Sequence, residues 1–284
     1  MKHCAVISCN ANTLAVLIFL SLGPAWLFAD GLLQQLPSEG TAVKYKLTQT
    51  GMVHIFESGK VDIEPQKISI NGDGYIQLAV VGSAVVAGMN CRWIEIERDT
   101  RIGDRRIYAF TKLLVPEGDI KSPGDPLHRS LRVLHTADDK ATPELVKSER
   151  DRQAILAGLY EIIPRTPNAE NRVNTRLQEQ DIELSNGKLS CAGRVFDGVV
   201  DRYLPNGPHR DQGYFIFRVF SHPTIPTGTA YVEVHRESQT ISCERMSGLT
   251  EPTDKLQRVN VSTISRYQLL EVVQNVQSRF SNIN

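Results

Sequence analysis

The chain has 284 residues, of which 41% are hydrophobic and 23% charged, a composition typical of a protein with a packed core. Its 32 basic and 32 acidic residues cancel, so net charge gives no reason to expect binding to nucleic acid or to an anionic membrane surface. The length allows one large β domain or two small ones.

The first 29 residues have the pattern of a secretory signal peptide. Lys2 supplies a positive charge, residues 14–28 form an apolar run, and Ala29 ends the run with a small side chain, so cleavage is expected before Asp30. The run is shorter than the ~20 residues that a membrane-spanning helix needs. We therefore predict an exported protein, periplasmic or secreted, with an uncleaved membrane anchor as the alternative.

The rest of the chain is rich in short runs of β-branched and aromatic residues. The clearest unit joins runs 91–97 and 106–115 through the polar turn Gly103-Asp104, which predicts a β-hairpin. Both faces of this hairpin carry apolar side chains, so each face should be covered. Further strands are expected at 41–49, 52–56, 61–63, 67–70, 75–86, 128–135, 188–196, 214–220, 229–237, 240–246 and 256–262.

Turns and helices interrupt these strands. Residues 71–74, Asn-Gly-Asp-Gly, predict a tight turn, and Ser238-Gln239 predicts another. The motif Thr142-Pro143-Glu144 is typical of a helix start, and we expect a helical insertion over about 142–180, whose part 168–180 is a second polar helix or an exposed loop. The spacing of Leu269, Val273, Val276 and Phe280 predicts a C-terminal helix over about 265–280.

These elements predict a mainly β protein of the α+β class. We expect residues 30–284 to form a single domain, built on one large curved antiparallel sheet or half-barrel, with the helical insertion and the C-terminal helix packed on it.

Three stretches, taken together, resemble a known family. They are LPSEGTAVKYKL at 36–47, the segment 81–97 that ends in CRWIEIE, and IYAFTKLLVPEGDI at 107–120. These are similar to exported bacterial proteins that we liken to the lipoprotein-carrier (LolA/LolB-like) superfamily of half-barrels. The resemblance implies a half-barrel whose concave apolar face holds acyl chains, and it transfers a shape and no dedicated site residue.

Four aromatic residues are candidates for lining an apolar pocket. Trp93 is the principal one, either as a core residue that anchors the hairpin or as a ligand contact. Phe110, Tyr45 and Tyr75 would share the same cavity.

The cysteines leave a second question open. After signal cleavage Cys91, Cys191 and Cys243 remain, and an oxidising compartment would allow one disulfide in any of three pairings. The alternative is that each is a small buried apolar residue. We expect no metal site, because no close Cys or His pair has ligand spacing, and no motif implies a cofactor.

Three functions compete. The first is a non-enzymatic protein that binds a lipid or another apolar ligand. The second is a structural or interaction domain of the cell envelope that meets a protein partner through its sheet edge or terminal helix. The third is a hydrolase with a site assembled from scattered acids and histidines, for which Glu95, Glu97 and His235 are the residues to substitute. No catalytic residue is assigned, because two acids on a solvated strand face are common.

Overall fold

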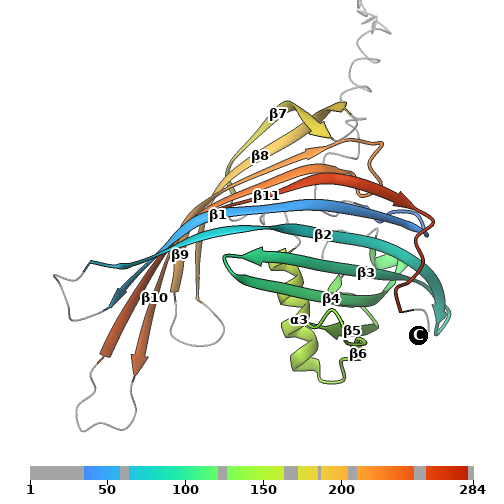
Figure 1. Cartoon of the computed structure of the whole chain (residues 1–284), viewed down its shortest axis with the longest axis horizontal. Coiled ribbons are helices and arrows are strands. Elements are labelled where there is room, and N and C mark those ends of the chain that lie inside the picture. Colours follow the sequence, from blue (N-terminus) through green and yellow to red (C-terminus); the bar gives the residue numbers. More distant parts are fainter. Residues whose placement is uncertain are drawn as a thin grey trace, which may run out of the picture.

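A computed structural model describes residues 35–57, 64–120, 127–162, 172–184, 187–203, 210–245 and 254–280. They form one open antiparallel sheet of 11 strands (Figure 1). The strands are β1 (Thr41–Glu57), β2 (Gln66–Val86), β3 (Met89–Ile102), β4 (Arg105–Pro116), β5 (Arg132–Thr136), β6 (Glu144–Leu145), β7 (Arg172–Leu184), β8 (Gly187–Tyr203), β9 (Arg210–Ser221), β10 (Thr229–Arg245) and β11 (Asp254–Gln274). The predicted signal peptide lies outside the described residues, so export stays a prediction.

Two meanders make up the sheet. The strand order is β6-β5-β4-β3-β2-β1-β11-β10-β9-β8-β7, so every neighbouring pair except β1 and β11 is consecutive in the chain. β1 and β11 pair from Thr41–Gln274 to Glu57–Gln257 and join the meanders at the centre. The first and last of the described strands therefore hold the two halves together.

The predicted hairpin is confirmed as β3 and β4. The pairing runs from Cys91–Pro116 to Ile102–Arg105, around a turn at Gly103-Asp104. Its faces differ: Ile94 and Ile96 point to one side of the sheet, while Trp93 points to the other.

The predicted C-terminal helix is wrong, because residues 265–274 form the second half of β11. A bulge explains the misleading pattern. Tyr45 pairs with Leu269 and the preceding Lys44 pairs with Glu271, so Leu270 is an extra residue in β11. The extra residue makes the alternating pattern of the strand resemble helical spacing. Pairing with β1 and β10 nevertheless makes this segment a strand.

Among its described residues the predicted insertion is helical over α3 (Glu149–Ile162), the one helix longer than four residues in the described part of the chain. Its start is set by Ser148, whose Oγ accepts a hydrogen bond from the Asp151 amide at 3.3 Å. The predicted start at Thr142 is therefore too early, and Glu144–Leu145 instead pair with β5 as β6. Residues 172–180, expected as helix or loop, belong to β7, which forms a hairpin with β8.

Two predicted turns lie inside strands. Ser238 and Gln239 continue β10, and residues 71–74 continue β2. Gly74 has φ +154°, and a Cβ atom there would lie 2.2 Å from the Asp99 carbonyl oxygen of β3. The glycine thus permits a close approach of two strands and not a reversal of the chain.

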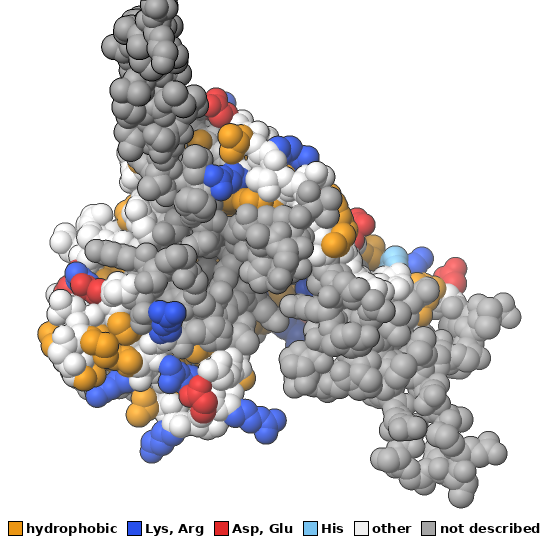
Figure 2. All heavy atoms as spheres, turned by 180° about the vertical axis from the view of Figure 1, so that it is seen from behind, with side chains coloured by type: hydrophobic (Ala, Val, Ile, Leu, Met, Phe, Trp, Pro, Cys, Tyr) orange, Lys and Arg blue, Asp and Glu red, His pale blue; other side chains and the backbone are white. Residues whose placement is uncertain are grey.

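The sheet has two faces, defined here by α3. The inner face packs against Leu156 and Leu159 of α3 and carries the main core, which includes Tyr45, Leu78, Ile94, Leu113, Phe196, Phe217 and Val232. The outer face carries a smaller cluster of Cys91, Trp93, Leu114 and Leu134. In Figure 2 the described surface intersperses basic, acidic and apolar side chains.

Replacing Gly74 with Ala tests the close approach of β2 to β3. We expect the free energy of unfolding to fall by about 1–3 kcal/mol, because the added Cβ overlaps backbone atoms. Gly118→Ala is the control, since a Cβ there meets no atom within 4 Å, and its effect should stay within about 0.5 kcal/mol. Equal effects in urea denaturation would contradict this account.

Candidate functional site: an outer-face groove and a C-terminal strap

The segment after β11 crosses the outer face of the sheet. We call residues 275–280 the strap. Asn275 turns the chain with φ +59°, and the Val276 amide donates a 2.8 Å hydrogen bond to the Gly40 carbonyl. Figure 1 shows this segment leaving β11 and passing the ends of β1 and β2. The strap then reaches β3 and β4, as its hydrogen bonds show.

Glu95 of β3 anchors the strap and is only 6% exposed. One carboxylate oxygen accepts a hydrogen bond from Ser278 Oγ at 2.5 Å and the other accepts one from the Arg279 amide at 3.3 Å. Glu97 accepts a 2.8 Å bond from the Arg279 guanidinium. Both carboxylates therefore hold the strap, and Glu95 does not lie on a solvated face.

Lys112 of β4 completes this contact. The side chain is 1% exposed, and Nζ donates to Ser278 Oγ at 3.1 Å and to the Phe280 carbonyl at 3.2 Å. Glu95 Oε1 lies 3.9 Å from Nζ. Burial lowers the pKa of Lys112, and the Glu95 charge opposes that shift.

The strap ends over two aromatic residues of β4. The Phe280 ring meets Phe110 edge to face, with ring centroids 5.0 Å apart. Arg279 donates a 2.8 Å hydrogen bond to the Tyr108 hydroxyl, and burial raises the pKa of Tyr108 to about 12. The strap thus covers the outer face of the hairpin around Glu95, Tyr108 and Phe110, while the inner face belongs to the main core.

Beside the strap the outer face opens into a groove of about 790 Å³. Its floor is a cross-strand row in which Gly82 of β2, Trp93 of β3, Leu114 of β4 and Arg132 of β5 are successive partners. The walls come from the strap and from the end of β2. The lining residues are Glu39, Gly40, Val81, Gly82, Ser83, Ala84, Val86, Trp93, Lys112, Leu114, Arg132, Val276, Gln277 and Ser278.

Trp93 and Gly82 shape this groove. Trp93 is 6% exposed, and Lys112 Nζ lies 4.9 Å from the centroid of its ring. Gly82 follows a β-bulge in β2. A Cβ atom at Gly82 would meet only the indole Cδ1, at 4.0 Å, so the missing side chain leaves space above the floor.

The four predicted pocket residues lie in different places. Trp93 lines the groove. Phe110 and Tyr75 share the outer face, but Phe110 lies under Phe280, and the Tyr75 hydroxyl lies 3.5 Å from a Glu97 oxygen. Tyr45 is buried on the inner face, where its hydroxyl donates to the Thr229 carbonyl at 2.9 Å. The predicted shared cavity therefore does not form from these four residues.

The charged residues at the groove differ in their partners. Glu39 forms a 2.8 Å ion pair with Arg92, and Lys112 is held by Glu95 and the strap. Arg132 is exposed, and its guanidinium makes no hydrogen bond or ion pair with the described residues. Sequence reasoning missed Lys112 and Arg132. A lysine within the apolar run FTKLLVP was the available signal.

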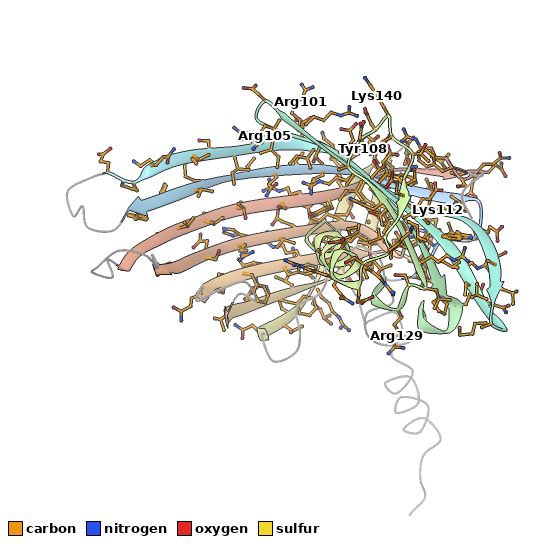
Figure 3. The ribbon with its side chains drawn as sticks, turned by 90° about the horizontal axis from the view of Figure 1, so that it is seen from below. Arg101, Arg105, Tyr108, Lys112, Arg129 and Lys140 are labelled. Atoms are coloured by element: carbon orange, nitrogen blue, oxygen red, sulfur yellow. The ribbon has the colours of Figure 1, made fainter. Side chains whose placement is uncertain are left out.

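Other basic residues gather away from the groove. Figure 3 shows Arg101, Arg105 and Lys140 near the β3–β4 turn and Lys112 farther along the sheet. Close to this turn Arg106 forms ion pairs with Asp99 at 2.7 Å and Asp139 at 2.5 Å. The turn is therefore a mixed-charge surface.

The arrangement gives no support to the hydrolase hypothesis. His235 lies on β10, four strand positions from Glu95 on β3, a separation of about 19 Å at the usual strand spacing. His235 is 3.4 Å from Glu237 of the same strand. Within the described ranges no group of three His, Cys, Asp or Glu residues could hold a metal ion.

The cysteines are placed in part. Cys91 and Cys191 are free and buried, on β3 and β8 respectively. Burial raises the pKa of the Cys191 thiol to about 11, which disfavours the reactive thiolate. Cys243 lies on β10 opposite Leu256, and its side chain is outside the described part of the structure.

No protein-family model matches the sequence, and no curated protein matches it significantly. Within the described ranges, none of the helices combines the length and apolar character needed to cross a bilayer.

The strap contact can be tested with Ser278→Ala. Its hydroxyl bonds both Glu95 and Lys112, so removing it leaves two buried ionisable groups less well paired, and the free energy of unfolding should fall by about 1–3 kcal/mol. The neighbouring Gln277 is exposed, and Gln277→Ala should change the free energy of unfolding by no more than about 0.5 kcal/mol. If the two variants unfold at the same urea concentration, the strap contact does not stabilise the fold.

Proposed function

We propose that this protein is an exported, non-enzymatic binding protein that holds an apolar molecule in the outer-face groove. The observation that carries the proposal is the open groove beside Trp93. Its volume of about 790 Å³ lies within the range of small-ligand pockets, about 300–1,000 Å³. Its walls include the half-buried apolar side chains of Val81, Ala84 and Val86, and Leu114 lies buried in the floor.

The half-barrel interpretation supports this proposal in a modified form. An open antiparallel sheet with a helix on one face agrees with the expected half-barrel shape. The inner face of the central strands is packed, however, with Val43, Tyr45 and Leu78 fully buried or nearly so. The apolar ligand would therefore lie on the outer face, where the groove is open.

A protein-interaction domain is the weaker alternative. The terminal helix that would have met a partner is the strand β11. The edge strand β7 could pair with a partner strand, but it carries Arg176, Glu179, Asp181 and Glu183. Charged side chains on an edge strand oppose such pairing.

Filling the groove from its floor tests the proposal. Gly82→Leu places a side chain in open space, so dodecanol should bind at least about tenfold more weakly, which corresponds to about 1.4 kcal/mol. Stability should change little, because a Cβ at this position meets no backbone atom within 4 Å. Gly118→Leu, at an open site outside the groove, is the control and should bind dodecanol normally.

Tryptophan fluorescence provides the readout. The chain has two tryptophans: the predicted cleavage before Asp30 removes Trp26, and Trp26→Phe removes it from any uncleaved chain, so Trp93 is the sole reporter in either case. Dodecanol should shift the emission of Trp93 saturably in the Gly118→Leu protein and not in the Gly82→Leu protein. An unchanged affinity in the Gly82→Leu protein would contradict binding in this groove.

A further inference from the structure

We propose that the natural ligand of the groove is a single-chain amphiphile with an anionic headgroup, which Arg132 binds while the alkyl chain lies over Leu114 and Trp93 toward Gly82. The inference rests on the proposed function and adds the chemical class and orientation of the ligand.

The floor of the groove has one charged end and one apolar end. Arg132, Leu114, Trp93 and Gly82 lie on four consecutive strands, so the distance from the first to the last is three strand spacings, about 14 Å. Beyond Gly82 the wall continues with Ala84 and Val86. A ligand that satisfies both ends needs a polar head and an extended apolar chain.

The charge of the headgroup follows from which charged side chains of the groove are not already engaged by described residues. The Glu39 carboxylate is already paired with Arg92 at 2.8 Å, and the Lys112 ammonium is engaged by Glu95, Ser278 and Phe280. Arg132 alone among these ionisable residues is exposed and makes no polar contact with the described side chains. Because a guanidinium binds carboxylate, sulfate or phosphate oxygens through paired N–H groups, an anionic head is the complementary partner.

The floor between Arg132 and Gly82 favours an alkyl chain over a sugar or a base. Trp93 and Leu114 of the floor are buried on the outer face and offer no acceptor to a sugar or a base edge, and Gly82 has no side chain. The polar groups of Ser278 and Lys112 are bonded to each other at 3.1 Å. The two functions of the groove are therefore separated: the cation at Arg132 orients the ligand and the apolar floor holds its chain.

Charge-matched probes test this assignment. Laurate, dodecanol and dodecyltrimethylammonium share one chain length and differ in headgroup charge, and each would be titrated against the Trp26→Phe protein at neutral pH. We expect laurate to bind about five- to tenfold more tightly than dodecanol, and dodecyltrimethylammonium to bind most weakly. Arg132→Gln should lower the affinity for laurate to about that for dodecanol, whereas Arg132→Lys should retain part of the preference for laurate.

Arg101→Gln is the matched control, because Arg101 is an exposed arginine near the β3–β4 turn, away from Lys112 (Figure 3). It should leave all three affinities unchanged, and urea denaturation should show that the Arg132 variants are folded. If dodecanol binds and Arg132→Gln does not alter the preference among the headgroups, the assignment of an anionic headgroup is wrong. The proposed binding of an apolar molecule in the groove would still be supported. If no probe shifts the emission of Trp93, both this inference and the proposed function fail.

Discussion

The buried contact among Lys112, Ser278 and Glu95 determines how the outer face of this protein is organised. Removing one partner of a buried ion pair costs about 3–5 kcal/mol, because the remaining charge loses its compensation. Here the hydroxyl of Ser278 donates to the carboxylate and accepts from the ammonium. The strap is therefore required to satisfy two charged groups that β3 and β4 place next to each other, and its position defines one wall of the groove.

The two faces of the sheet take different roles as a result. On the inner face apolar residues pack against α3 and leave the central strands filled. On the outer face the strap covers Phe110 and Glu95 but stops short of the row through Trp93, and Gly82 leaves that row without a side chain. The same hairpin thus contributes both to the packed core and to the floor of the groove.

Local patterns in the sequence predicted the β3–β4 hairpin, since its turn and both of its strands lie within residues 89–116. Such patterns gave wrong predictions where the local structure depends on contacts distant in the sequence or on a single residue. The extra residue Leu270 hid the strand alternation of β11, and Ser148 starts α3 later than the Pro143 motif suggested. Trp93 could be proposed from its type and position, whereas the pairing of Glu95 with Ser278, 183 residues away, has no local signal.

The most direct test of this account is a crystal structure with 12-bromododecanoate, in which anomalous scattering locates the end of the alkyl chain. We predict a single bromine peak on the outer face near Gly82, with the carboxylate at Arg132 and the strap in place. A bromine peak on the inner face between the sheet and α3, or no ordered peak at saturating ligand, would contradict the account.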